Sequence, residues 1–409
     1  MPTSSDDIWS RDRGTVTKFW ASVNRSLPVT GPPRAQGGHR LQGFTLKLLV
    51  QPHDGIAPLL AGIKSAKESI DILIFRMDWK ALEAGLSEAS GKGVAVRALI
   101  AQTNRGGEAK LRALETRFLA AGITVGRTSN DLVRYHGKMM IVDGKTLFLL
   151  SFNFVHIDID HSRGFAIVTK SAKTVQEAVK LFEADLNRQT YTAGLNTFVV
   201  SPANSRKQLT AFIKGAKTQL WIYDPKIADK QLLHLLEDHA KAGLDIKIIG
   251  STIARSANLK VTPLTSMRLH TRTIIRDGRQ AFVGSQSLRQ PELDLRREIG
   301  IIVRDAKVVK TLLSTFETDW ASSGFDETRK ATKPEKVSAK SKTAQKATRA
   351  LVKEMAPLRK TLKNAIRHAV TRAGKQAQAK GELKATVKDA VKKAVKEAVK
   401  EIAQEGEEG

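Results

Sequence analysis

The sequence predicts an α/β fold made of two tandem copies of one unit, followed by a basic, partly helical C-terminal tail. Two observations lead to this fold class. Four blocks of the chain recur further along in the same order. Within each copy, amphipathic stretches alternate with short apolar runs, which is the pattern of helices that cover a largely buried sheet. Because internal repetition determines architecture more than any local motif, we expect the two copies to form one pseudo-twofold body.

The first two blocks repeat at a distance of 150 residues. Residues 63–75 (IKSAKESIDILIF) match residues 213–224 (IKGAKTQLWIYD), and residues 91–100 (GKGVAVRALI) match residues 241–250 (KAGLDIKIIG). Each pair begins with a helical stretch that contains Ala-Lys and continues into an apolar run rich in β-branched residues. A second helix and a second strand after a glycine turn complete the predicted unit.

The other two blocks repeat at a distance of 134 residues. Residues 136–144 (HGKMMIVDG) match residues 270–278 (HTRTIIRDG), and residues 181–189 (LFEADLNRQ) match residues 315–323 (TFETDWASS). The change of offset means that the first copy holds 16 additional residues between its second strand and its histidine motif. We therefore expect an added helix in the first copy.

The repeats define the boundaries of four regions. We place the first repeat at residues 46–191, with the added helix at 108–122, and the second repeat at residues 196–325. The pattern of residues 1–45 predicts a short helix followed by a Gly/Pro-rich linker. This helix either caps the folded body or lies on a membrane surface. Residues 326–409 predict a basic tail, first disordered and then helical, that either self-associates or binds an anionic surface.

Composition excludes several classes of protein. A chain without cysteine has no disulfide framework, no Cys-ligated zinc, no iron–sulfur cluster and no thiol nucleophile. No apolar run reaches the ~18 residues of a membrane span, and the first residues lack the apolar core of a secretory signal. We therefore expect a cytoplasmic protein that is peripheral to the inner membrane face. The net charge of +27 favours a polyanionic partner, either nucleic acid or an anionic lipid surface.

The pattern H-x-K-x4-D occurs at matched places in both copies, with arginine in place of lysine in the second: His136, Lys138, Asp143 and His270, Arg272, Asp277. Residues two apart in a strand share a face, so each histidine projects together with its cation. An imidazole can attack phosphorus or transfer a proton, and a neighbouring cation stabilises the charge that grows on phosphate oxygens. Two matched copies indicate a single active site for phosphoryl chemistry.

A small polar cluster begins seven residues after each aspartate of these motifs. The first cluster is LSFN and the second is GSQS, each where a strand ends and a turn begins. Hydroxyl and amide groups at such a place can donate hydrogen bonds to phosphate oxygens. We expect four side chains to bind phosphate: Ser151, Asn153, Ser285 and Ser287.

With these motifs the sequence resembles the phospholipase D superfamily, and within it the bacterial cardiolipin synthases and related phosphatidyltransferases. The resemblance covers about residues 46–325, including the RREIG segment at 296–300. It implies a two-step phosphodiester exchange that uses neither a metal nor a cofactor. One histidine becomes a phosphohistidine while the other protonates the leaving alkoxide, and water or an alcohol then displaces the histidine. By this similarity His136 is the nucleophile and His270 the general acid, with the reverse assignment as the alternative.

The sequence departs from the family pattern at residues 272 and 164 and in the polar clusters, of which the first lacks the glycine and the second the asparagine. Arg272 replaces the second lysine and keeps the charge, but its larger fork changes the geometry of phosphate contact. The first-copy equivalent of Glu298 is Gly164, so only the second copy keeps the acid that would orient a histidine. The resemblance also implies that Asp143 and Asp277 tie down the turn after their strand and do not touch substrate.

Three functions remain open at this stage. The first is a phospholipase D-like phosphodiesterase or phosphatidyltransferase that acts on phospholipid headgroups at an anionic membrane surface. The second is a metal-independent nuclease, since the basic tail suits a polyphosphate substrate. The third is a catalytically weakened scaffold that binds phosphorylated ligands or nucleic acid. The sequence leaves the acceptor alcohol and the oligomeric state undetermined.

Overall fold

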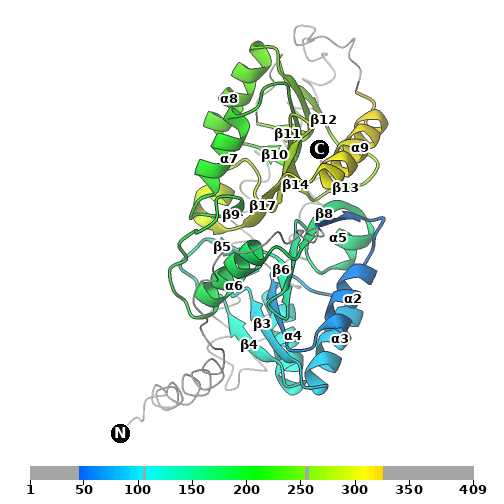
Figure 1. The fold of residues 1–409 in the computed structure, drawn as a ribbon, viewed down its shortest axis with the longest axis vertical. Coiled ribbons are helices and arrows are strands. Elements are labelled where there is room, and N and C mark those ends of the chain that lie inside the picture. The colour runs from blue at the N-terminus through cyan, green and yellow to red at the C-terminus, as the bar shows by residue number, and fades with distance from the viewer. Residues whose placement is uncertain (1–45, 105–106, 254–257, 326–409) are drawn as a thin grey trace, which may run out of the picture.

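The computed structural model describes residues 46–104, 107–253 and 258–325 (Figure 1). The predicted N-terminal helix and linker at 1–45 and the predicted tail at 326–409 lie outside the described residues.

Each copy of the repeat forms a mixed β-sheet in which seven strands lie side by side. The first copy supplies, in spatial order, β1 (Lys47–Gln51), β8 (Ser162–Thr169), β7 (Thr146–Leu150), β6 (Met139–Val142), β2 (Ser69–Ile74), β3 (Ala95–Ile100) and β4 (Thr124–Arg127). The second copy supplies β9 (Phe198–Val200), β17 (Ile299–Val303), β15 (Gln280–Gly284), β14 (Arg272–Arg276), β10 (Gln219–Ile227), β11 (Asp245–Thr252) and β12 (Lys260–Thr262). The two orders correspond strand for strand, which confirms the predicted α/β fold with two tandem repeats.

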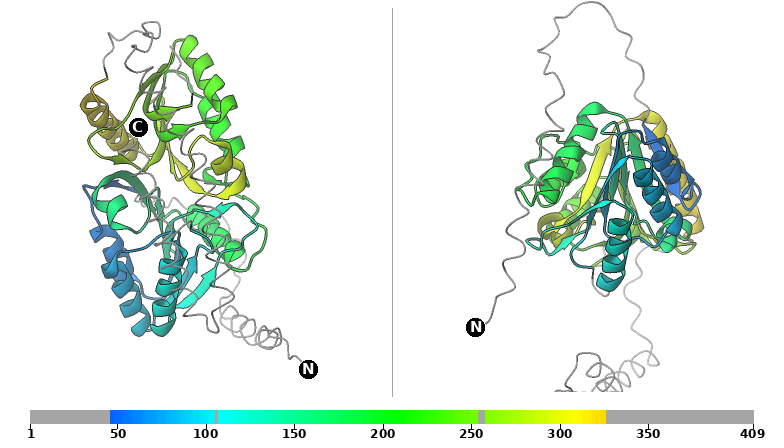
Figure 2. Two further views of the ribbon diagram at one scale, coloured as in Figure 1. Left: turned by 180° about the vertical axis from the view of Figure 1, so that it is seen from behind. Right: turned by 90° about the horizontal axis from the view of Figure 1, so that it is seen from below.

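Helices cover the outer face of each sheet. The first sheet is covered by α2 (Ala57–Ser65), α3 (Lys80–Gly91) and α4 (Glu108–Ala120), and the second by α7 (Ser205–Lys214) and α8 (Lys230–Lys241). Helix α4 lies in the 16 additional residues of the first copy, where the sequence predicts an added helix. Figure 2 shows the two copies stacked along the longest axis of the body.

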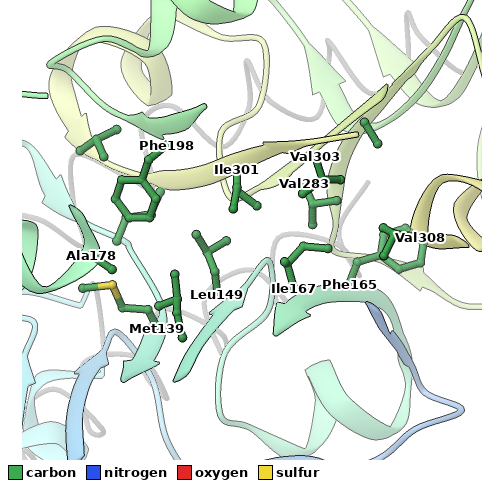
Figure 3. Close-up of a cluster of buried hydrophobic side chains, with 14 of the residues drawn as sticks. Met139, Leu149, Phe165, Ile167, Ala178, Phe198, Val283, Ile301, Val303 and Val308 are labelled. Atoms are coloured by element: carbon green, nitrogen blue, oxygen red, sulfur yellow. The ribbon is translucent and has the colours of Figure 1, made fainter. Parts of the chain in front are cut away.

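The inner faces of the two sheets share one hydrophobic core. Strand alternation separates the faces, so that Ile72 packs under α2 and α3 while its neighbour Leu73 belongs to the shared core. Helices α6 (Ala172–Leu186) and α9 (Ala306–Ser322) also contribute to this core. Figure 3 shows Met139, Leu149 and Ile167 of the first copy opposite Ile301 and Val283 of the second. The two copies therefore form one body, not two separate domains.

Short elements join the copies beside the histidine motifs. Strand β5 (Arg134–Tyr135) pairs in parallel with β16 (Arg296–Arg297), and β13 (Arg268–Leu269) pairs in parallel with β8. The helical turns α5 (His156–Asp160) and η2 (Pro291–Leu295) follow the polar clusters of the first and second copy. These pairings place both histidines at the boundary between the copies.

Candidate active site

His136 is held by a carboxylate from the other copy. It lies between β5 and β6, is buried, and has Nδ1 2.8 Å from Oε2 of Glu298. Glu298 is fully buried at the start of β17. With the proton on Nδ1 donated to this carboxylate, Nε2 keeps its lone pair. Lys138 lies just before β6, and its Nζ is 2.9 Å from each ring nitrogen. Residues 136–138 lie outside the strands, so the shared strand face expected from the sequence is not what brings the two side chains together.

The electrostatics of this group keep the ring neutral at neutral pH. Burial lowers the pKa of His136 well below its usual value, and the charges of Lys138 and Arg272 lower it further. Burial lowers the pKa of Lys138 to about 7. Burial also raises the pKa of Glu298 to about 7, against the nearby charge of Lys138. A neutral imidazole with an unprotonated Nε2 is the form that can act as a nucleophile.

His270 has a different environment from His136. Its Nε2 lies 3.5 Å from Oδ2 of Asp158, while its Nδ1 is buried and has no hydrogen-bond partner within residues 46–104, 107–253 and 258–325. Gly164, the equivalent of Glu298, offers no carboxylate there, and a Cβ at this position would lie 2.8 Å from Cδ1 of Phe152. The two histidines therefore differ in which ring nitrogen faces a carboxylate.

Asp158 is a site residue that the sequence analysis does not identify. It lies on α5 of the first copy, is buried, and accepts hydrogen bonds from Nδ2 and the backbone N–H of Asn153 at 2.6 and 2.9 Å. Glu292 stands 134 residues later, on η2, so an acid occurs in both copies at this position. This repeated acid is the signal in the sequence that points to Asp158.

The two motifs form one electrostatic cluster. Burial lowers the pKa of His270 well below its usual value, and the charges of Arg272, Lys138 and His136 contribute further lowering. Besides burial, the charges of other residues act on the pKa of Lys138: Glu298 of the second copy raises it, Arg272 of the second copy lowers it, and Asp158 of the first copy raises it. Arg272 donates from Nη1 to the carbonyl of its own His270 at 2.6 Å. The fold thus brings the cations and imidazoles of both copies into one place.

The four polar side chains expected to bind phosphate have partners within the protein. Ser151 Oγ accepts the backbone N–H of Phe165 at 2.9 Å, and Ser285 Oγ accepts that of Ile299 at 3.1 Å. These two hydroxyls join the ends of neighbouring strands. Asn153 donates to Asp158, and Ser287 Oγ accepts from Nε of Arg272 at 3.2 Å. Phosphate binding by these side chains stays a prediction.

The motif aspartates bind backbone N–H groups away from the histidines. Asp143 accepts from the N–H groups of residues 67–69 at 2.8 to 3.1 Å. Asp277 accepts from those of residues 217–219 at 2.8 to 3.2 Å. Both aspartates have a φ of 52°, which the turn after the strand requires. These contacts are those of residues that fix a turn.

The described part of the chain contains neither a cluster of metal ligands nor a membrane-spanning helix. Across residues 46–104, 107–253 and 258–325, no group of three or more histidine, aspartate or glutamate side chains is placed to hold a metal ion. Within the same part of the chain, no helix has the length and apolar character needed to cross a bilayer.

Comparison with known families gives a match over both copies. The family model for the PLD-like domain of cardiolipin synthase matches residues 59–186 and 209–320. Cardiolipin synthase 1 of Bacillus cereus is 25% identical over 355 residues, covering 70% of this chain and 68% of that protein. Cardiolipin synthase of Halalkalibacterium halodurans is 28% identical over 132 residues, 28% of this chain and 26% of the relative.

Two solved structures share the arrangement of both copies. The polyphosphate kinase of Porphyromonas gingivalis aligns with a TM-score of 0.57 at 19% identity, covering 68% of this chain and 50% of the kinase. The phosphatidylserine synthase of Haemophilus influenzae aligns with a TM-score of 0.54 at 10% identity, covering 76% of this chain and 94% of the synthase. At these identities the likeness shows a common fold.

Proposed function

The chain belongs to the family defined by the PLD-like domain of cardiolipin synthase, and we propose that it exchanges the headgroup alcohol of phospholipids through a phosphohistidine on His136. The family match supports phosphatidyl transfer as the general type of reaction. The observation that supports it for this chain is the single cluster formed by both motifs. His136 has a neutral, carboxylate-oriented ring, and the cations of both copies surround it.

The proposed reaction has two displacements at phosphorus. Binding of the anionic phosphodiester favours the protonated form of His270, whose pKa is low in the free protein, so that His270 enters the reaction as an imidazolium. Nε2 of His136 attacks, the P–O bond to the leaving alcohol breaks, and His270 gives that oxygen its proton. An incoming alcohol or water then gives its proton to His270 and attacks phosphorus, and the P–N bond to His136 breaks. Lys138 and Arg272 hold the non-bridging oxygens, whose charge grows in each transition state. Atoms and protons balance over the cycle, so the enzyme returns to its starting state.

The experiment tests turnover and the covalent adduct together. Wild-type protein is mixed with phosphatidylglycerol vesicles without divalent metal, acid-sensitive adducts are preserved by alkaline quenching, and peptides are analysed by mass spectrometry. We expect a phosphatidyl adduct on His136 and loss of turnover in His136→Ala. His156→Ala is the matched control, because His156 is half exposed on α5 and stacks on Trp79. An adduct on His270 would reverse the two roles, and cleavage of DNA or RNA without lipid turnover would make the protein a nuclease.

Exposed apolar side chains beside the site favour lipid over nucleic acid. Val133 is 65% exposed and Leu295 45% exposed, and the N–H of Val133 donates to the carbonyl of Leu295 at 3.0 Å. They precede His136 and Glu298 by three residues each. Ile157, 53% exposed, directly precedes Asp158. We call Val133, Leu295 and Ile157 the apolar rim. Exposed apolar side chains next to a site for phosphate chemistry are typical of surfaces that enter a lipid interface.

Replacing two residues of the apolar rim, Val133 and Leu295, tests whether the substrate is a lipid or a nucleic acid. We expect the double variant Val133→Ser/Leu295→Ser to bind anionic vesicles more weakly and to turn over vesicle lipid about tenfold more slowly, since each apolar group buried in lipid adds affinity. Its activity on a short, soluble phosphodiester should be unchanged. Leu119→Ser is the control, because Leu119 is 57% exposed on α4. Equal losses in both variants would show that the rim has no special contact with lipid.

A further inference from the structure

Two buried arginine–aspartate pairs connect the copies, and the repeat relates them to each other. Arg163 and Arg297 are 134 residues apart, and so are Asp185 and Asp319. Each arginine pairs with the aspartate of the other copy, so the two pairs cross the boundary in opposite directions. We call Arg163–Asp319 and Arg297–Asp185 the two clamps.

The geometry of both clamps is bidentate and buried. Arg163 donates from Nε and Nη2 to the two carboxylate oxygens of Asp319 at 2.7 and 2.8 Å. Arg297 donates from Nε to Asp185 at 3.1 Å and has Nη2 2.9 Å from the same carboxylate. None of these four side chains is more than 10% exposed. Two parallel bonds fix the orientation of the guanidinium as well as its position.

The remaining guanidinium nitrogen ties each clamp to an edge strand. Nη1 of Arg163 donates to the carbonyl of Gln51, at the end of β1, at 2.8 Å. Nη1 of Arg297 donates to the carbonyl of Ser201, just after β9, at 3.0 Å. Each arginine side chain therefore connects its own copy to a helix of the other copy, α9 for Arg163 and α6 for Arg297.

The backbone of each clamp arginine holds the histidine of the other copy. The carbonyl of Arg297 accepts the N–H of His136 at 2.7 Å. The carbonyl of Arg163 accepts the N–H groups of His270 and Thr271 at 3.1 and 2.9 Å. A shift of either arginine would thus move a histidine relative to the phosphate-binding cations. Displacements of about 1 Å at a reacting group lower rates by about 100-fold.

We propose that Arg163 and Arg297, with Asp319 and Asp185, are positioning residues that set the separation of the two histidines. Each clamp places the histidine of the opposite copy through one backbone carbonyl. The kinetic test of this role rests on the proposed function, whereas the spectroscopic test does not.

The kinetic test compares Arg297→Lys and Arg163→Lys with Arg97→Lys. Lysine keeps the charge but loses the fork. Arg97 makes a bidentate bond with Asp71 at 2.6 and 2.8 Å and an ion pair with Glu183 at 2.7 Å, both inside the first copy, so its loss should cost stability without a direct effect on either histidine. We expect similar drops in melting temperature in all three variants. kcat on phospholipid should fall about 100-fold in the two clamp variants only, with KM little changed. Equal kcat in clamp and control variants would overturn the proposal.

The two clamp variants should also differ from each other in the burst of leaving group that they release. An aryl phosphodiester with a nitrophenol leaving group needs no proton from His270 in the first displacement. Arg163→Lys, which disturbs His270, should keep the burst of nitrophenol, whereas Arg297→Lys, which disturbs His136, should lose it. Loss of the burst in both variants or in neither would contradict this division of roles.

A measurement on the protein alone separates this inference from the proposed function. In NMR spectra, the Cε1–H resonance of His136 should shift in Arg297→Lys and that of His270 in Arg163→Lys, with neither shifting in Arg97→Lys. These shifts are expected even if wild-type protein turns over no substrate, in which case only the proposed function has failed. Unshifted resonances in both clamp variants would refute the positioning role.

Discussion

Among individual residues, Glu298 and Lys138 decide how the site responds to pH, because burial brings the pKa of each to about 7. As pH falls below this value, Glu298 gains a proton and ceases to hold His136 as a charged acceptor. As pH rises above it, Lys138 loses the charge that binds phosphate. We expect kcat/KM on a soluble phosphodiester, which reports the free enzyme, to peak near neutrality.

Two variants test the assignment of the pH limbs. Lys138→Arg should move the alkaline limb upward, because a guanidinium keeps its proton across the measured range. Glu298→Gln should remove the acidic limb and lower the maximum, because the amide oxygen is a weaker acceptor for Nδ1–H. Limbs that stay in place in both variants would show that other groups control the profile.

Asp158 is the carboxylate that lies near Nε2 of His270. Asp158→Asn removes the charge near Nε2 of His270 and keeps a side chain of the same size. We expect turnover of phospholipid to fall about 10- to 100-fold, because His270 would be a weaker general acid without the carboxylate near its Nε2. Asp160→Asn is the control, because this aspartate pairs with His156 on the outside of the same helix. Equal activity of the two variants would exclude Asp158 from the reaction.

At the scale of the elements, the turns after β6 and β14 depend on one carboxylate each. Asp143→Ala leaves the N–H groups of residues 67–69 without their acceptor, and we expect a loss of about 1–3 kcal/mol in the free energy of unfolding. Urea titration measures this loss. Asp277→Ala should give a similar loss, because its contacts repeat those of Asp143. A variant that loses activity but keeps its stability would show that the aspartate reaches the substrate.

The long elements could be predicted from the sequence and the short ones could not. Repeated apolar runs predict β2 and β10, and the change of offset predicts α4. Strands β5 and β16 have two residues each and exist because they pair with each other across the copies. Such a pairing leaves no periodic pattern in either segment, since periodicity needs several residues on one face.

At the scale of the whole molecule, the shared core predicts that the two copies unfold together. Leu149 lies fully buried between the sheets (Figure 3), and Leu149→Ala should lower the free energy of unfolding by about 2–5 kcal/mol. Calorimetry should still show a single transition, because the lost contacts belong to both copies. Leu119→Ala, on the exposed face of α4, should change stability by less than about 0.5 kcal/mol. Two separate transitions would show that the copies are independent.

The same scale explains which parts of the site the sequence reveals. The duplicated motifs point to His136 and His270, because residue type and spacing are local. The partners of these histidines are not local. The family resemblance marks Glu298 as an acid that orients a histidine, but not that this histidine is His136, 162 positions away. Asp158 approaches His270 from a helical turn that is marked in the sequence only by the matching acid Glu292. Only the packing of the two copies determines these pairings.

The two copies differ at one position beside the histidines, because the second has Glu298 where the first has Gly164. A symmetric dimer of first copies would set a glycine beside each histidine, and a symmetric dimer of second copies would set a glutamate there. In the single chain, one imidazole receives that glutamate and the other does not. The two halves of the site are therefore chemically different, and a chain with two first copies or two second copies would have a different set of carboxylates beside its histidines.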